Sequence, residues 1–248
     1  MADAPYLSVV VPVYEEEDSL APLHAELDAA LRGVAGGVEF LYVDDGSRDA
    51  SLARLREIAA RDSRVRVVAL DGNRGQSAAL EAGFRRARGE VVATLDADGQ
   101  NDPADLPGLL AGLADADVVN GVRTGRRDSL ARKLSSRIAN GFRNRMTHES
   151  VTDVGCSLRV MRASYLRRVK LYRGMHRFLP TLLRMEGARV TELPVSHRPR
   201  RHGRSKYGIA DRLLVGLEDV FAVRWMQKRQ LDWRLREPAV LASVRRER

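Results

Sequence analysis

The strongest constraint on the fold is a regular alternation of two sequence patterns over the first 120 residues. Short runs rich in β-branched and other apolar residues are separated by longer segments in which apolar residues recur every three or four positions. The first pattern is typical of β-strands and the second of amphipathic helices. Strands are expected at residues 7–14, 38–47, 65–70 and 90–98, and helices at 15–33, 49–62 and 76–89.

Strands that alternate with helices of this length form right-handed βαβ units, which build a mostly parallel sheet. A chain of 248 residues, 44% of them hydrophobic, is long enough for one large domain of this kind. We therefore predict an α/β fold in which helices flank a mostly parallel sheet. In such sheets ligands bind beyond the carboxyl ends of the strands.

After residue 101 the pattern is less regular. Asp102 followed by Pro103 predicts a helix start, because Asp is a favoured N-cap and Pro fits the first helical position. Strands are expected at residues 116–123, at 155–162 as an edge strand, and at 188–199. Helices are expected at residues 129–146, 175–187 and 208–229.

Acidic side chains end two of the predicted strands. Asp44 and Asp45 end the second strand, and Asp96 and Asp98 end the fourth. Both pairs would face one crevice, where they repel each other unless a cation or the hydrogen-bond donors of a ligand lie between them. Asp96, Asp98 and Gln100 alternate along the chain and suit Mg²⁺ or Mn²⁺ held together with phosphate oxygens. The alternative is that the aspartates only cap the next helix.

Charge is distributed unevenly along the chain. Residues 1–120 hold 11 Arg and Lys against 22 Asp and Glu, whereas residues 121–248 hold 31 against 11, so the net charges are −11 and +20. A basic half of this kind is typical of a partner for phosphates, whether of nucleic acid, anionic lipid or a phosphorylated substrate. Nucleic acid is disfavoured, because only 5% of the residues are aromatic and no nucleic-acid motif is present.

The sequence favours a cytoplasmic protein. Cys156 is the single cysteine, so no internal disulfide points to an oxidising compartment, and no run of eighteen apolar residues predicts a transmembrane helix. The segment 208–229 carries an apolar stripe that includes Phe221 and Trp225, flanked by Arg and Lys. This stripe suits a helix that lies on an anionic membrane surface, and packing against the core is the alternative.

Several motifs together carry a family resemblance. The segments VVVPVYEEE, DDGSRD, GQSAALEAGFRRARGEVVATLDADGQNDP and RHGRSKYG lie in order along residues 9–208. The chain thereby resembles a family-2 glycosyltransferase of the dolichyl-phosphate mannose synthase type, which includes bacterial polyprenyl-phosphate glycosyltransferases. The resemblance implies a GT-A (Rossmann-like) domain over residues 1–208, with a nucleotide-sugar half at 1–120 and an acceptor half at 121–208. Residues 209–248 would then form an amphipathic C-terminal tail.

The resemblance also assigns the donor site. The family's nucleotide-binding positions match Pro12, Tyr14, Glu16, Asp44, Asp45 and Asp96, although Glu15 stands where Asn is usual. The metal site for Mg²⁺ or Mn²⁺ corresponds to Asp96, Asp98 and Gln100, with Asp98 and Gln100 as direct ligands. The donor implied is a UDP- or GDP-sugar, and the reaction inverts the anomeric centre.

For the acceptor, the resemblance implies a polyprenyl (undecaprenyl or dolichyl) phosphate at the cytoplasmic face of the membrane, with a separate membrane protein as a possible partner. Its phosphate would be held by Arg123, Arg132, Ser136, Arg200, Ser205 and Lys206. All of these except Ser205, together with Asp98, form the predicted catalytic set. A phosphate is already an anion and needs no general base, whereas a hydroxyl acceptor would need one. Asp153 is the candidate for that base, and an ion pair with an Arg is its structural alternative.

Overall fold

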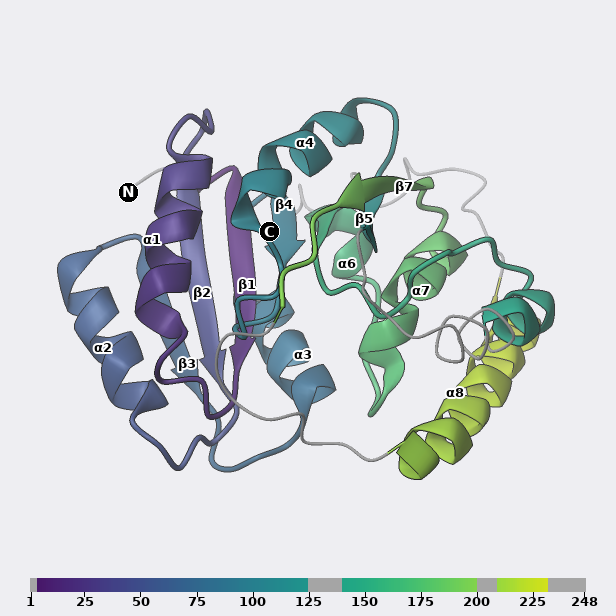
Figure 1. Ribbon diagram of the computed structural model, residues 1–248. Helices are drawn as coiled ribbons and strands as arrows, with labels where there is room; N and C mark the ends of the chain where they lie inside the picture. The colour runs from purple at the N-terminus through teal and green to yellow at the C-terminus, as the bar shows by residue number, and fades with distance from the viewer. Residues whose placement is uncertain (1–3, 125–139, 200–208, 232–248) are drawn as a thin grey trace, which may run out of the picture.

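The computed structural model describes residues 4–124, 140–199 and 209–231, without the side chains of 209–215. It shows a seven-stranded sheet covered by helices on both faces (Figure 1). The strands are β1 (Leu7–Val13), β2 (Val38–Asp44), β3 (Val65–Ala69), β4 (Val91–Thr94), β5 (Val118–Arg123), β6 (Arg159–Arg162) and β7 (Val190–Val195). The helices are α1 (Leu20–Leu31), α2 (Ser51–Arg61), α3 (Gln76–Arg86), η1 (Pro103–Asp105), α4 (Leu106–Ala111), η2 (Gly112–Ala114), α6 (Ala163–Leu166), η3 (Met175–Phe178), α7 (Leu179–Met185) and α8 (Ile209–Arg229). Residues 140–147 are also helical.

The sheet has the strand order β3-β2-β1-β4-β6-β5-β7. Every neighbouring pair is parallel except the two that involve β6, which runs antiparallel to both β4 and β5. The predicted α/β class is therefore confirmed. Residue 120 lies inside β5, so the acidic and basic halves of the chain share one sheet.

The prediction that residues 155–162 form an edge strand is wrong. Met161 of β6 pairs with Val92 of β4 on one side and with Val118 of β5 on the other, so β6 is an interior strand. Its Val160 and Met161 are fully buried. The short run RVMR, flanked by arginines, has the composition of an edge strand, and its sequence carries no information about which strands lie beside it.

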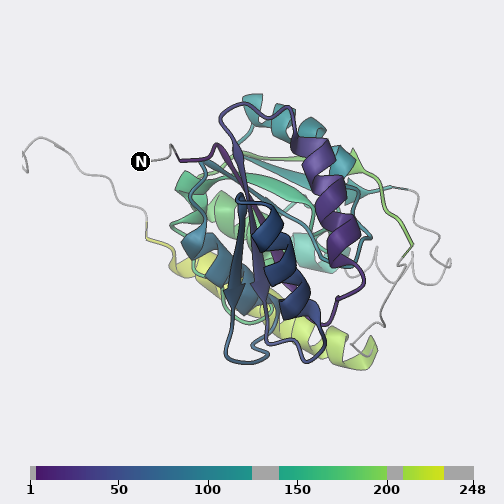
Figure 2. The same cartoon turned by 90° about the vertical axis from the view of Figure 1, so that its left-hand side faces the viewer.

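Two apolar clusters pack on opposite faces of the sheet. Val9 and Val11 of β1 point to a cluster formed with α1, α2 and α4, whereas Val10 points to a cluster formed with α3, α6, α7 and α8. Alternate residues of a strand face opposite sides, so β1 contributes to both. Figure 2 shows the resulting layers, with α1 and α4 on one side of the sheet and α8 on the other.

The predicted helix start at Asp102 is confirmed. The Asp102 side chain accepts a hydrogen bond from the Ala104 N–H at 3.0 Å, and Pro103 occupies the first helical position. The first turn is the 3₁₀ helix η1, and α4 follows it directly.

Helix α8 has one buried and one exposed apolar face. Val220 and Val223 are 4% and 0% exposed, whereas Phe221 and Trp225 are 55% and 63% exposed. Asp219, on the inner side, forms an ion pair with Arg177 of η3 at 3.1 Å. Core packing and an exposed stripe are therefore both present on this helix. No described helix is long and apolar enough to cross a membrane.

Gly83 lies where α3 packs on the sheet, and a Cβ there would lie 2.4 Å from Val10 Cγ1 and 3.2 Å from Val43 Cγ2. We expect Gly83→Ala to lower the free energy of unfolding by about 1–3 kcal/mol, because overpacking outweighs the better helix propensity of alanine. Gly108→Ala in α4 is the matched control, since a Cβ there meets nothing within 4 Å. It should raise the free energy of unfolding by up to about 1 kcal/mol. Urea unfolding measures both changes, and effects of the same sign would contradict the packing argument.

Candidate active site

The predicted donor-site residues gather at one edge of the sheet. Strand β1 lies between β2 and β4, and all three run parallel. The segments that follow them, residues 14–17, 44–47 and 96–100, therefore lie side by side at the carboxyl edge. Pro12 is tolerated in this interior strand because β1 pairs with β4 only as far as Val10, so no ladder hydrogen bond to β4 is required at Pro12.

The loop after β1 is tied to the loop after β2. The backbone N–H of Glu15 donates to Ser47 Oγ at 3.0 Å, and that of Glu16 donates to Ser51 Oγ at 2.9 Å. Glu15 has a φ of 53°, in the left-handed region. Asparagine adopts this conformation more readily than glutamate, which gives a physical reason for the Asn usual at this position in the family that the sequence resembles.

Asp44 and Asp45 have different surroundings although both are buried. Asp45 accepts hydrogen bonds from the backbone N–H groups of Arg74 and Gly75, at 2.7 and 2.8 Å, and so shapes the loop that leads into α3. Asp44 Oδ2 accepts the Ser47 N–H at 3.3 Å, whereas its Oδ1 is buried and has no hydrogen-bond partner among the described residues. A buried acceptor without a donor is costly, and a ligand N–H or O–H would satisfy it.

Gly46 allows this crevice to form. Its φ is +69°, and a Cβ there would lie 2.4 Å from the backbone carbon of Gly72. Only glycine lets the loop after β2 come this close to the loop after β3. The DDGS motif therefore has three functions in the loop. Asp44 offers an unsatisfied acceptor, Asp45 fixes the loop before α3, and Gly46 allows the close approach of the two loops.

Asp96 and Asp98 stand at the end of β4. Asp96 Oδ1 accepts a hydrogen bond from Gln76 Nε2 at 2.7 Å, and the Asp96 N–H donates to Asn101 Oδ1 at 3.3 Å. Asp98 is 7% exposed, and its Oδ1 accepts the N–H of Gln100 at 3.1 Å. The alternative that these aspartates only cap the next helix is disfavoured, because Asp102 is the residue that caps η1.

Burial dominates the electrostatics of Asp96. Desolvation, with the neighbouring charge of Asp98, raises the pKa of Asp96 to about 6. The hydroxyl of Ser157, which donates to Asn101 Oδ1 at 2.8 Å, and the charges of Arg159 and Arg123 oppose this rise. A carboxylate held in this way gains from a cation placed beside it.

The two carboxylates fit a divalent metal whose coordination a ligand completes. No group of three or more His, Cys, Asp or Glu side chains that could hold a metal occurs among residues 4–124, 140–199 and 216–231. Mg²⁺ is usually held by one or two carboxylates together with substrate phosphates, so two aspartates at a strand end suit it. Asp96 and Asp98 would be the protein ligands, and the predicted role of Gln100 stays a prediction.

Arg123 and Asp153 form a bidentate ion pair on the other side of β4. Arg123 Nε and one terminal nitrogen each donate to an oxygen of Asp153 at 2.7 Å. The pairing raises the pKa of Arg123 against the opposing effect of its burial. The structural alternative for Asp153, an ion pair with an Arg, is confirmed, while the role of Arg123 at the acceptor phosphate stays a prediction. The other predicted phosphate-binding residues lie outside the described residues: Arg132, Ser136, Arg200, Ser205 and Lys206.

Sequence reasoning missed several residues that shape the surroundings of Asp96. Gln76 begins α3, Ser157 precedes β6, and the buried Arg159 opens β6. One signal was available in the sequence, namely an arginine next to the apolar pair Val160 and Met161 of a short strand. The contacts of Gln76 and Ser157 join distant parts of the chain and have no sequence signature.

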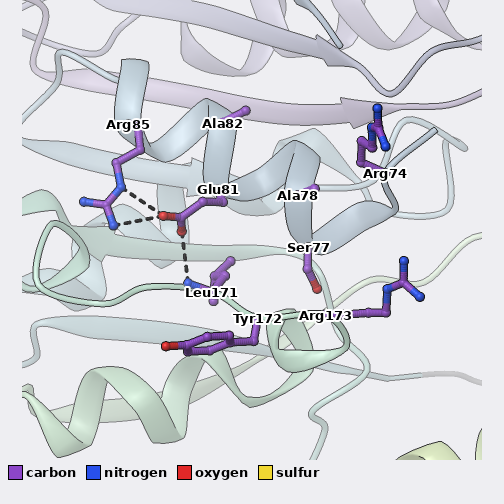
Figure 3. A pocket seen from close by; sticks show the side chains of 9 residues that line it. All are labelled: Arg74, Ser77, Ala78, Glu81, Ala82, Arg85, Leu171, Tyr172 and Arg173. Carbon is purple, nitrogen blue, oxygen red and sulfur yellow. Dashed lines mark hydrogen bonds and ion pairs between the residues drawn. The ribbon is translucent and has the colours of Figure 1, made fainter. Parts of the chain in front are cut away.

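A pocket of about 340 Å³ lies between α3 and residues 171–173, beside the acidic crevice (Figure 3). Glu81 closes one end through Arg85 and the Leu171 N–H, and Arg74 and Arg173 lie at the other end. Ser77 of this pocket shares a 2.7 Å hydrogen bond with His176. Burial lowers the pKa of His176 to about 3, so this histidine is neutral, and its hydrogen bond ties η3 to the start of α3.

An acidic crevice at the carboxyl edge of a parallel half-sheet, followed by the antiparallel β6, defines a GT-A fold. Solved structures share it. Glucosyl-3-phosphoglycerate synthase from Mycobacterium tuberculosis, in complex with Mg²⁺ and UDP, has a TM-score of 0.65 at 20% identity over 93% of this chain and 82% of that one. A mannosyltransferase from Pyrobaculum calidifontis, in complex with GDP-Man and Mn²⁺, has a TM-score of 0.62 at 20% identity over 94% of this chain and 67% of that one.

The model of glycosyl transferase family 2 matches residues 8–170, so the chain belongs to that family. Dodecaprenyl-phosphate galacturonate synthase of Rhizobium johnstonii is 41% identical, over 86% of this chain and 64% of that protein. Undecaprenyl-phosphate 4-deoxy-4-formamido-L-arabinose transferase of Edwardsiella ictaluri is 42% identical, over 82% of this chain and 63% of that protein. The chain thus spans about three fifths of the length of these curated relatives.

Because the pKa of Asp96 is raised to about 6, protons compete with a metal at this carboxylate as the pH falls. We expect the Mn²⁺ affinity to decrease between pH 7 and pH 5, approaching about tenfold per pH unit below the pKa. Calorimetric titration of Mn²⁺ at several pH values measures this. Asp96→Asn should bind more weakly at pH 7 and show a flatter profile, and an unchanged profile in this variant would assign the proton to another group.

Proposed function

We propose that the protein is an inverting, metal-dependent glycosyltransferase that moves a sugar from a UDP- or GDP-sugar to a polyprenyl phosphate at the cytoplasmic face of the membrane. The observation that carries the proposal is the pairing of Asp96 and Asp98 at the end of β4, beside the orphaned Asp44 oxygen, in a family-2 fold.

The donor site is supported by the acceptor groups that line the crevice. The buried Asp44 Oδ1 can accept a hydrogen bond from a base or ribose, and the loop of residues 14–17 lies beside it. Structural neighbours of the same fold were crystallised with UDP and Mg²⁺ or with GDP-Man and Mn²⁺. A metal bound at Asp96 and Asp98 would supply positive charge to the diphosphate that leaves the sugar.

A phosphate acceptor is supported by the net charge of the second half of the chain and by the ion pair that Asp153 forms. A hydroxyl acceptor needs a general base, yet the Asp153 carboxylate is held by the Arg123 guanidinium through two bonds of 2.7 Å. A phosphate acceptor needs no base, and the net charge of +20 in the second half suits it. The names of the relatives from Rhizobium johnstonii and Edwardsiella ictaluri contain dodecaprenyl phosphate and undecaprenyl phosphate.

The exposed face of α8 supports contact with an anionic membrane surface. Phe221 and Trp225 lie one helical turn apart and are more than half exposed, and the helix ends in Lys228 and Arg229. Aromatic side chains with flanking cations suit a helix that lies in the membrane interface. A polyprenyl substrate stays in its bilayer, so an enzyme that uses it must reach the surface.

The transfer can be measured directly. Purified protein is incubated with undecaprenyl phosphate, Mn²⁺ and a panel of labelled UDP- and GDP-sugars, and label is counted in the organic phase. We expect one donor to label the lipid and Asp98→Ala to lose at least about 99% of this activity, because the metal and the leaving diphosphate lose a ligand. Asp115→Ala, which removes an exposed carboxylate far from the crevice, is the control and should keep full activity.

If UDP or GDP binds with the metal and no donor labels the lipid, the polyprenyl acceptor is wrong. The second candidate, a transferase with a hydroxyl acceptor such as a growing glycan, would then be tested with soluble acceptors. If neither nucleotide binds with the metal, the donor site itself is wrong.

Membrane contact predicts a separate result. We expect the double variant Phe221→Ser, Trp225→Ser to bind anionic vesicles at least about tenfold more weakly, since each aromatic contributes about 1.5–3 kcal/mol when it is buried. Vesicle sedimentation measures the affinity. Tyr172→Ser is the matched control, because Tyr172 is 52% exposed and lies outside α8. Equal binding by the double variant and the control would show that the α8 stripe does not contact the membrane.

A further inference from the structure

Arg159 lies buried beneath the acidic crevice. It opens β6, pairs with Thr94 at the carboxyl end of β4 and with Asn120 of β5, and is 4% exposed. Thr94 is two residues from Asp96, so Arg159 lies beside the strand end that carries this carboxylate, and its charge opposes the rise in the pKa of Asp96. The roles proposed above leave Arg159 unused.

Among the described residues, the Arg159 guanidinium donates only to neutral oxygens. Its Nε donates to Asn120 Oδ1 at 2.8 Å, and its terminal nitrogens donate to the carbonyls of His176 at 2.8 Å and Val154 at 2.9 Å. Within the described part of the chain it forms no ion pair, unlike Arg123, which Asp153 neutralises. A buried charge without a direct counter-ion is expensive. A neutral side chain of similar size would cost less folding free energy at this position, which indicates a functional role for the positive charge.

The use follows from the charges around Asp96. A divalent cation bound by both Asp96 and Asp98 would be fully neutralised, because the two carboxylates together carry two negative charges. The positive charge of Arg159 offsets the negative charge of Asp96. The ion pair of Arg123 with Asp153 contributes little net charge. With Arg159 in place, the bound cation keeps part of its charge for the diphosphate of the donor.

We propose that Arg159 is a positioning residue that sets the charge balance of the metal site, so that a cation held by Asp96 and Asp98 attracts the donor diphosphate. Its three hydrogen bonds fix this charge by tying β6 to β5, to residue 154 and to η3. The proposal rests on the proposed function, because it assumes a metal and a nucleotide in the crevice. It concerns residue 159, which is not a ligand of either.

Arg159→Met tests the charge, because methionine is uncharged and of comparable length. The test measures two affinities by calorimetry: Mn²⁺ without nucleotide, and UDP or GDP at saturating Mn²⁺. We expect the variant to bind Mn²⁺ roughly threefold to tenfold more tightly, since a repelling charge is gone, and the nucleotide more weakly by a similar factor. General damage to the site would weaken both affinities, so opposite signs separate the two causes.

Two control variants sharpen the result. Arg159→Lys keeps the charge without the planar fork of donors, so it should keep both affinities within about threefold of the original protein. Arg162→Met removes an arginine from the same strand. Arg162 pairs with Asp117 at 3.6 Å, away from the crevice, and its loss should change neither affinity.

The outcomes separate this inference from the proposed function. If the original protein binds neither nucleotide with Mn²⁺, the proposed function fails first. If it does bind, a variant in which both affinities fall together, or neither changes, overturns the role of Arg159. Should Arg159→Met fail to fold by circular dichroism, Arg159→Gln carries the same test, because it is also neutral and keeps an amide donor for one of the three oxygens.

Discussion

The structure around the crevice depends on one requirement, the compensation of the Asp96 carboxylate at the end of a buried strand. Such a group is costly unless it is hydrogen-bonded or balanced by charge. Gln76 from α3 donates to it at 2.7 Å, and Arg159, which pairs with Thr94 at the end of β4, brings a positive charge near it. Gln76 and Arg159 are distant from each other in the sequence, and both are distant from Asp96 along the chain. The packing of α3 on β1 and β2 and the pairing of β6 with β4 are therefore also what builds the site.

The alternation of strand and helix patterns was enough to predict the first half of the sheet. Buried parallel strands such as β1 and β2 are nearly continuous apolar runs, and the helices between them have clear apolar faces. The place of β6 could not be predicted in the same way. Its four residues lie antiparallel between β4 and β5, and both of these strands are distant from β6 in the sequence. Pairing of that kind depends on tertiary packing rather than on local pattern.

Part of the site could also be predicted. Acids at the ends of two parallel strands must meet at one edge, so Asp44, Asp45, Asp96 and Asp98 follow from topology alone. The different environments of Asp44 and Asp45 could not be predicted from the sequence. They depend on the loop before α3, whose N–H groups at Arg74 and Gly75 donate to Asp45 and not to Asp44. The partners of Asp96 were missed for a similar reason. Gln76 and Ser157 become neighbours of Asp96 only after the chain has folded.

The antiparallel β6 gives the uneven charge of the chain a physical consequence. Strand β6 comes from the basic half of the sequence and pairs with β4 of the acidic half. Arg159 of the basic half therefore lies beside the strand end that carries Asp96 of the acidic half. At the end of β4 the carboxylates repel an anionic ligand until a cation is bound, and β6 brings the buried positive charge of Arg159 beside that strand end. In the function proposed above, a nucleotide sugar would enter with its metal beside these carboxylates, and a phosphate acceptor would be bound by the half of the chain with a net charge of +20. The positive charge of that metal would then offset part of the repulsion between the two anions, which is what a transfer between two phosphates requires.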